Sequence, residues 1–287
     1  MLIFKIFTVY VYVQALFCGC GPDRRREGFE RGRSEYAVKR VGRMPAKIPE
    51  NSGLALSVDG ALWTHQDAGF DNELFKVTKE GKLLEKHPVP GTSNIDWEDL
   101  ARDDQGNLYI GDFGNNLNAR RNLRIFKVPE RTLAPVDTLH FSFADQKAFP
   151  PDKQNKNFDA EAFFWLDGKL HLFSKNRKVK APMRVYELPD SPGHYPVPPS
   201  DSLRINAMIT GADVNPAQRQ IALLGYGKLY LFDYQEPDNL LGGRRICMAI
   251  PRSGQAEAIV YLPDNSILFT NEGGKIFRVS KKAGRER

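Results

Sequence analysis

The stretch from Asp96 to Glu130 constrains the fold more than any other part of the chain, because weaker copies of it recur on both sides. An acidic residue opens an apolar alternating run, a DDQGN turn follows, and a second run, LYIGD, ends at another acid. A polar Gly/Asn loop and a third run, LRIFKV, complete the unit. Alternation with a period of two residues between short turns predicts antiparallel strands.

Four further copies of this unit give the chain a period of roughly 45 to 60 residues. They begin at Asn51, Asn157, Ile209 and Gln255. Each copy has a strand, a turn that carries Asp, Asn, Pro or Gly, a second strand, a variable loop and a third strand. Repetition of this length with hairpin punctuation is typical of propeller blades. The sequence therefore predicts an all-β fold that forms a single β-propeller.

A fourth, outer strand can be placed after four of the five copies. These outer strands are expected around Leu84, Leu139, Ile205 and Ile246. The last copy lacks one, and the only unassigned strand-like run is 35–41. We therefore expect this N-terminal run to close a ring of five four-stranded blades, which removes exposed sheet edges. Six blades remain possible if 145–156 or 190–200 hides a strand pair, but both segments favour loops.

The N-terminus has the pattern of an export signal. Residues 1–20 place one Lys before a run that stays apolar to Phe17, too short to span a bilayer, which predicts a signal peptide. Cys20 follows Gly19 and has Phe17 three positions upstream, which resembles a lipobox, so we expect Cys20 to be lipidated. An ordinary signal peptide or an uncleaved anchor are the alternatives. With a lipid on Cys20, Cys247 would be left as a buried apolar residue and no intrachain disulfide could form.

Residues 21–34 are rich in Arg with interspersed Glu and predict a basic tether ahead of a propeller domain at 35–287. The tether could lie against anionic lipid headgroups or act as a solvated spacer. The expected location is the bacterial cell envelope, membrane-anchored and facing the periplasm, because Gly21-Pro22-Asp23 lacks a clear acidic cluster. The chain carries a net charge of +6 without the aromatic and basic alternation that indicates nucleic-acid binding.

The segments DWEDLA, LYIGDFGNN and IFKVPE, with the Arg pair between them, resemble secreted bacterial propellers of the phytase-like and SMP-30/NHL groups. The resemblance implies a propeller outside the cytoplasm. In the lactonases of that group the entry glutamate is followed by Gly-Pro, whereas Asp99 and Leu100 follow Glu98 here. DWEDLA and LYIGD also resemble, locally, the calcium-activated nucleotidases, which are five-bladed and hold calcium on the axis.

The first strand of each blade lines the central channel, so matched entry positions form a ring around the axis. These positions are Gly53 or Ser52, Glu98, Glu161, Gly211 and Glu257. The three glutamates cannot all ionise at short range without compensation, and calcium is the cation we expect them to bind. Alternatively they accept backbone N–H bonds between blades, or two of them form an acid/base pair as in five-bladed glycosidases.

A second set of candidate residues lies where the second strands emerge. We predict a ligand site formed by Asp112, Asn115, Asn116, Arg120, Arg121, Lys175, Asn271 and Glu272. Basic side chains beside an acidic mouth suit a phosphate- or carboxylate-bearing ligand. The simpler interpretation is that Asp, Asn and Gly build turns while Arg and Lys solvate a long loop.

Two classes of function follow from these patterns. The first is a binding module of the cell envelope, with a partner that is an envelope protein or an anionic small molecule and a cation in the channel. The second is a calcium-dependent hydrolase of phosphoesters or lactones, in which Glu98, Glu161 and Glu257 hold the metal and Arg120 or Arg121 steers the substrate. No motif for a nucleophile or general base favours catalysis.

Overall fold

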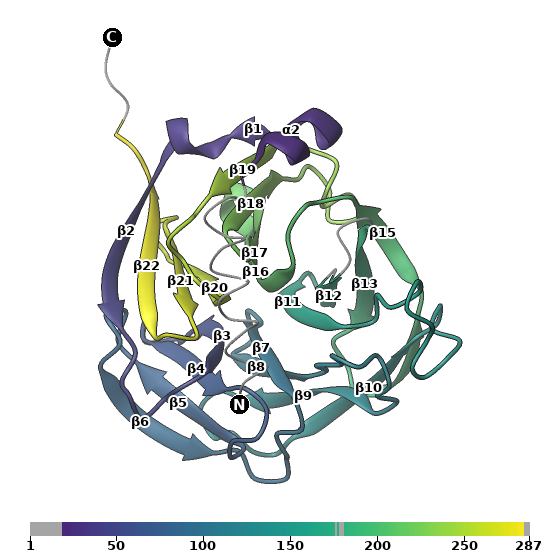
Figure 1. Cartoon of the computed structure of the whole chain (residues 1–287). Helices are drawn as coiled ribbons and strands as arrows, with labels where there is room; N and C mark the ends of the chain where they lie inside the picture. Colours follow the sequence, from purple (N-terminus) through teal and green to yellow (C-terminus); the bar gives the residue numbers. More distant parts are fainter. Residues whose placement is uncertain (1–18, 176, 178–180, 284–287) are drawn as a thin grey trace, which may run out of the picture.

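The computed structural model describes residues 19–175, 177 and 181–283, and it is a ring of five β-sheet blades around a common axis (Figure 1). No helix within the described ranges is both long enough and apolar enough to cross a membrane. The five blades confirm the all-β propeller that the repeats predict, because each repeat forms one sheet whose first strand faces the channel.

The blades follow the chain in order, with one late strand joining an earlier sheet. Blade 1 contains β3 (Asn51–Leu56), β4 (Leu62–Gln66), β5 (Glu73–Val77) and β6 (Leu83–Pro88). Blade 2 contains β7 (Trp97–Arg102), β8 (Asn107–Asp112), β9 (Leu123–Pro129), β10 (Asp137–Phe143) and β14 (Gly193–Val197). Blade 3 contains β11 (Ala160–Leu166), β12 (Lys169–Ser174), β13 (Met183–Pro189) and β15 (Pro199–Leu203).

Blade 4 contains β16 (Ile209–Asn215), β17 (Gln220–Gly225), β18 (Lys228–Asp233), β19 (Arg245–Ala249) and the short β1 (Glu30–Arg31). Blade 5 contains β20 (Ala256–Tyr261), β21 (Ile267–Asn271), β22 (Lys275–Lys281) and β2 (Tyr36–Arg43). The remaining elements are α2 (Gly21–Glu27), η1 (Gly32–Ser34) and η2 (Pro216–Gln218).

Strand β2 closes the ring as predicted, because it pairs antiparallel with β22, with Val38 opposite Val279. The predicted outer strands around Leu84, Leu139 and Ile246 are also present. The strand expected around Ile205 is wrong, because the outer strand of blade 3 ends at Leu203. The loop expected at 190–200 is wrong too, since this stretch holds β14 and the start of β15.

Strand β14 was missed because it makes no hairpin. It lies parallel to β10 of the preceding blade, where His140 and His194 are register partners whose rings stack 4.6 Å apart. A parallel strand that returns from another blade leaves no turn signature in the sequence.

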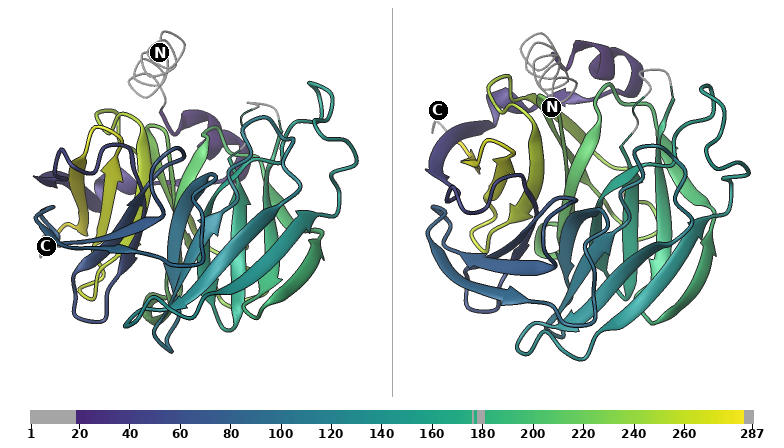
Figure 2. Two further views of the ribbon diagram at one scale, coloured as in Figure 1. Left: turned by 90° about the horizontal axis from the view of Figure 1, so that it is seen from below. Right: turned by 60° about the horizontal axis from the view of Figure 1, so that its bottom comes forward.

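Apolar side chains of neighbouring blades pack face to face and form the core. Between blades 3 and 4 the aromatic rings of Phe164, Phe173, Tyr230 and Phe232 are buried. At about 25 cal/mol per Å² of apolar surface, burial of such rings is the main stabilising contribution. Figure 2 shows the blades packed side by side in a ring. This packing brings the first strands of neighbouring blades into contact with one another.

Residues 20–34, which we call the N-terminal strap, pack on blade 4 instead of forming the expected solvated tether (Figure 1). Asp23 is 1% exposed and accepts hydrogen bonds from the Lys228 ammonium at 2.6 Å and the Asn206 amide at 2.7 Å. The Phe29 ring packs on Tyr230 with centroids 5.3 Å apart. The Arg-rich composition hid these contacts, because only one acid and one aromatic ring of the strap are buried.

The strap is joined to blade 4 by a disulfide between Cys20 and Cys247. This contradicts the expectation that no intrachain disulfide forms and that Cys247 is only a buried apolar residue. The two cysteines are 227 positions apart, so their proximity follows from the ring and not from local sequence. One sulfur cannot carry both a thioether-linked lipid and a disulfide, so the two states of Cys20 exclude each other.

Candidate functional site

The predicted entry positions coincide with a β-bulge in every blade. Register shifts occur between Ser52 and Leu54, Trp97 and Leu100, Ala160 and Ala162, Ile209 and Gly211, and Ala256 and Ala258. The unpaired residues are therefore Gly53, Glu98 with Asp99, Glu161, Thr210 and Glu257. The sequence suggested Gly211 for the fourth blade, but the unpaired residue there is Thr210. Bulges redirect side chains out of the ladder, which explains how the glutamates reach the channel.

Two of the three ring glutamates already have partners within the protein. Glu161 forms ion pairs with the Lys175 ammonium and with Arg177, the latter at 3.0 Å. Glu257 accepts a hydrogen bond from the Tyr226 hydroxyl at 2.8 Å. Burial alone would lower the pKa of Lys175, but the charges of Glu161 and Glu257 raise it above its usual value. Lys175 is thus a counter-ion and not a free ligand-binding cation.

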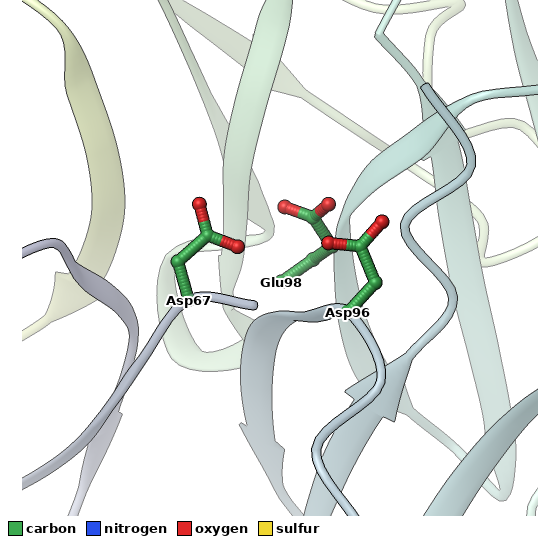
Figure 3. Close-up of side chains that lie close together, drawn as sticks. All are labelled: Asp67, Asp96 and Glu98. Carbon is green, nitrogen blue, oxygen red and sulfur yellow. The ribbon is translucent and has the colours of Figure 1, made fainter. Parts of the chain in front are cut away.

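Glu98 differs, because no described residue donates a hydrogen bond to its carboxylate although the residue is only 6% exposed. Two acids lie beside it: Asp67, directly after β4, and Asp96, directly before β7. One carboxylate oxygen from each of the three residues lies within 4.8 Å of the others. Figure 3 shows the three carboxylates facing one another across the gap between blades 1 and 2. We call these residues the acidic trio.

The pKa values in the acidic trio are raised. Burial, followed by the charges of Asp67 and Asp159, raises the pKa of Asp96 to about 7. Burial and the charge of Glu161 raise the pKa of Glu98 well above its usual range, and burial raises that of Asp67. Carboxylates at this separation need either protons or a cation to compensate their charge.

Oxygen donors in an irregular arrangement suit calcium, which accepts several carboxylate and carbonyl ligands in flexible geometry. Of the predicted ligands Glu98, Glu161 and Glu257, the structure brings only Glu98 into the acidic trio. Asp67 and Asp96 were missed as ligands. Asp67 directly follows the second strand of its blade, as Lys175 does in blade 3, and Asp112 and Asn271 were chosen from the ends of second strands in other blades, so the repeat alignment contained the signal.

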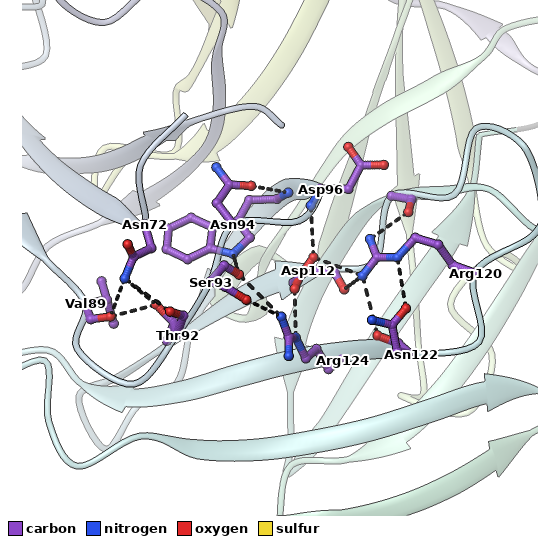
Figure 4. A network of polar contacts seen from close by, with 12 residues as sticks. Asn72, Val89, Thr92, Ser93, Asn94, Asp96, Asp112, Arg120, Asn122 and Arg124 are labelled. Atoms are coloured by element: carbon purple, nitrogen blue, oxygen red, sulfur yellow. Dashed lines mark hydrogen bonds and ion pairs between the residues drawn. The ribbon is translucent and has the colours of Figure 1, made fainter. Parts of the chain in front are cut away.

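Asp112 makes internal contacts, one of which positions Asp96. Its buried carboxylate accepts from Arg120 at 3.1 Å and Arg124 at 2.8 Å, and from the Asp96 amide at 3.0 Å (Figure 4). Arg120 also donates to the Gly114 carbonyl at 2.8 Å. The predicted ligand residues Asp112 and Arg120 therefore form the support behind the acidic trio.

The remaining loop residues of blade 2 also make internal contacts. The Asn115 amide donates to Asp159 at 2.9 Å and its side chain donates to the Phe158 carbonyl at 2.8 Å. Asn116 accepts a hydrogen bond from Arg177. The guanidinium of Arg121 lies 3.9 Å from the centre of the Phe149 ring, and so stacks on an aromatic face. These contacts join the loop of blade 2 to blade 3.

In blade 5, Asn271 closes its own turn by accepting from the Lys275 amide at 2.9 Å. Glu272 accepts from the Gln255 side chain at 2.6 Å. Burial, and then the charges of Asp67 and Glu50, raise the pKa of Glu272 to about 7. Asp67 of the acidic trio is thus the charged group that acts most strongly on Glu272.

The sequence suggested inter-blade backbone bonds as an alternative role for the glutamates, but in the first strands two aspartates accept such bonds. Asp99 accepts from the amides of Leu100 at 2.9 Å, Phe163 at 3.2 Å and Ala212 at 3.3 Å, so it joins three blades. Asp213 accepts from the Tyr261 amide at 2.6 Å. Asp99 follows Glu98 in the same bulge. The Glu98 side chain therefore joins the acidic trio, while the Asp99 side chain lies between the blades.

Comparison with known proteins supports the fold. No protein-family model and no curated protein matches the chain. Among solved structures, the chain is similar to PQQ-bound aldose sugar dehydrogenase from Streptomyces coelicolor at 12% identity, covering 86% of this chain and 98% of that one with a TM-score of 0.54. It is also similar to a putative gluconolactonase at 9% identity, covering 88% and 94% with a TM-score of 0.51.

A third similarity is to virginiamycin B lyase from Staphylococcus aureus, at 14% identity and a TM-score of 0.43. It covers 80% of this chain, which spans only 66% of the length of that lyase. The similarity to the first two structures shows a shared β-propeller fold, and at identities this low it shows nothing beyond the fold. The function must therefore be argued from the residues of the channel mouth.

Proposed function

We propose that the channel mouth is a divalent-cation site, with calcium as the preferred ion, held by Asp67, Asp96 and Glu98. The observation that carries the proposal is the Glu98 carboxylate, which is buried beside two other acids and lacks a hydrogen-bond donor among the described residues. A buried carboxylate without a partner is costly, and a cation would compensate it. The Arg120–Asp112 support holds Asp96 ready for such an ion.

The mouth favours a neutral, oxygen-rich ligand, such as a sugar or a sugar lactone, over a phosphoester. The charges of Glu50, Asp159 and Glu161 act on members of the acidic trio, and the charge of Asp67 acts on Glu272. The nearby cations Lys175 and Arg177 are already paired with Glu161 and Asp159. One bound divalent ion would leave the mouth net negative, which disfavours a phosphate dianion.

Lactone hydrolysis is the second candidate activity. A bound divalent ion would polarise an ester carbonyl, and the Tyr226 hydroxyl, held by Glu257, could orient a substrate oxygen in the channel. The similarity to a putative gluconolactonase agrees with this candidate at the level of fold. Binding without turnover requires only the cation and the channel, so it remains the first candidate.

An exported location belongs to this proposal. The Cys20–Cys247 disulfide supports it, because disulfides persist in oxidising compartments. A lipid anchor at Cys20 and an envelope partner remain proposals, and the anchor requires that the disulfide be absent. Mass spectrometry of the intact protein from its membrane and soluble fractions separates the two: a diacylglyceryl mass on Cys20 supports the anchor, and a Cys20–Cys247 peptide supports the disulfide.

Calcium binding can be measured by thermal unfolding in EDTA and then with added calcium, because an ion bound only by the folded state raises the midpoint. We expect a calcium-dependent rise in the wild type. Glu98→Gln should abolish this rise, since the amide retains the shape but loses the charge. Glu85→Gln, on an exposed strand of blade 1, is the matched control and should retain the full rise.

An equal calcium response in wild type and Glu98→Gln would contradict the site. Calorimetric titration with calcium, magnesium and zinc identifies the preferred ion on the same samples. Sugar lactones and a phosphoester should then be compared as ligands and substrates in the presence of that ion. Turnover of a lactone that is lost in Glu98→Gln would establish the second candidate.

A further inference from the structure

The outer edges of the five blades are not equivalent. In blade 2, β14 adds a fifth strand parallel to β10, and in blade 4, β1 adds a fifth strand parallel to β19. In the described part of the chain, the sheets of blades 1, 3 and 5 end at β6, β15 and β2 without a fifth strand. The fold therefore accepts an additional extended segment at an outer edge, and uses this option twice.

The edge of β2 has the backbone geometry that strand addition needs. The Glu35 carbonyl accepts from the Lys282 amide at 2.8 Å, so Glu35 faces β22. Because successive residues of an antiparallel strand alternate between partners, the backbone groups of Val38 and Arg40 face away from β22. At the end of β2 the Arg43 amide already donates to the Glu80 carbonyl of blade 1 at 3.1 Å. The β2 edge thus bonds a neighbouring segment there.

A groove of about 530 Å³ lies beside this edge, between blades 4 and 5. Its floor is apolar and includes Ile250 and the stacked rings of Phe269 and Phe277, whose centroids are 4.8 Å apart. Val38 of β2, which is 38% exposed, lines the same groove. Val38 and Arg40 are two positions apart on β2, so both side chains lie on the groove side of the sheet, and a segment paired with β2 would place alternate side chains on that same side.

The groove is also strongly basic. Arg33 of η1, Arg40 of β2 and Arg252 after β19 line it, so three separate segments each contribute a guanidinium. The Arg33 side chain donates to the Ala249 carbonyl at 3.1 Å. Among the described residues, none of these three arginines forms an ion pair, whereas the neighbouring Arg244 pairs with both Glu30 and Glu35. The groove therefore presents positive charge that lacks a partner.

We propose that β2 and this groove receive an extended acidic peptide segment of a partner protein as a fifth strand of blade 5. Backbone bonds to Val38 and Arg40 would hold the segment, and the carboxylates of its alternate residues, which lie on the groove side, would pair with the three arginines. A second copy of this chain fits poorly, because two β2 strands would bring Lys39 and Arg40 against like charges.

The test uses a short fluorescein-labelled peptide of alternating Glu and Val, with binding followed by fluorescence polarisation. We expect binding that weakens with salt, and no binding of the matching Lys/Val peptide. Val38→Pro removes an outward backbone donor without removing a bond to β22, and should weaken binding roughly tenfold or more. Arg252→Glu lies outside the sheet and should weaken binding by a similar factor. Arg24→Glu makes the same charge change outside the groove and should have little effect.

Unfolding midpoints confirm that each variant is folded, and Arg252→Glu tests the proposal even if Val38→Pro does not fold. Equal binding of the acidic and basic peptides, or binding unchanged in Arg252→Glu, would overturn the proposal. Dimerisation without peptide that Val38→Pro abolishes would make a second copy the occupant and would also overturn it. Glu98→Gln should leave peptide binding unchanged, so this surface can be judged independently of the cation site.

Discussion

Matched residues of the ring have different roles because their neighbours differ. Glu161 lies beside Lys175, Glu257 beside the hydroxyl of Tyr226, and Glu98 beside two further acids. The bulge gives all three the same backbone position, so the backbone alone does not decide which of them is available for a cation. The groups that decide it include Asp67, Lys175 and Tyr226, each of which directly follows the second strand of a blade, β4, β12 or β17.

Stability without metal should depend on pH through these acids. The pKa values of Asp96 and Glu272 are raised to about 7, above their usual values near 4, so the folded state binds more protons than the unfolded state between these limits. Stability in EDTA should therefore be highest at acidic pH and fall as the pH rises from about 4 through about 7. Urea unfolding across this range measures it. A calcium-saturated sample should lose less stability, and a flat profile in EDTA would contradict the raised pKa values.

At the scale of elements, the strap changes blade 4 from a surface-exposed sheet into a covered one. The parallel pairing of β1 with β19, the Phe29 ring and the disulfide all attach to this one blade. The Asp23–Lys228 pair is almost fully buried, with side-chain exposures of 1% and 0%. A buried pair of this kind is most sensitive to the loss of one partner, because the other charge is left uncompensated.

Asp23→Asn should destabilise the protein by about 3–5 kcal/mol, since Lys228 would remain buried without its counter-charge. Glu30→Gln is the matched control on the same strap, because Glu30 pairs with Arg244 at the surface and should contribute less than about 1 kcal/mol. Urea unfolding of both variants measures the difference. Similar losses in the two variants would mean that the strap does not hold Asp23 against Lys228.

At the scale of the whole molecule, the ring is closed in two ways. The outer strand β2 joins the N-terminal end of the chain to its last blade, and near the axis Asp99 joins blades 2, 3 and 4 through backbone amides. Both devices connect blades that are distant in sequence. We therefore expect the blades to unfold together and not one at a time.

Removing the central connection should weaken the whole ring. Asp99→Ala leaves the amides of Phe163 and Ala212 buried without an acceptor, at about 1–3 kcal/mol for each. Asp104→Ala, in an exposed turn of the same blade, serves as the control and should change stability little. Calorimetry should show one transition shifted to lower temperature. An unchanged midpoint would mean that water replaces the carboxylate without cost.

The sequence by itself determined the propeller, with five blades favoured over six, the closure by β2 and the entry positions of Glu98, Glu161 and Glu257. These features depend on a two-residue period and on turn residues, which act over a few positions along the chain. Only the tertiary structure decided that Asp67 and Asp96 join Glu98, that Asp99 connects three blades, and that Cys20 meets Cys247. These groups come together because the ring brings separate blades to one axis or one edge. The number of residues between two positions does not give their distance in space.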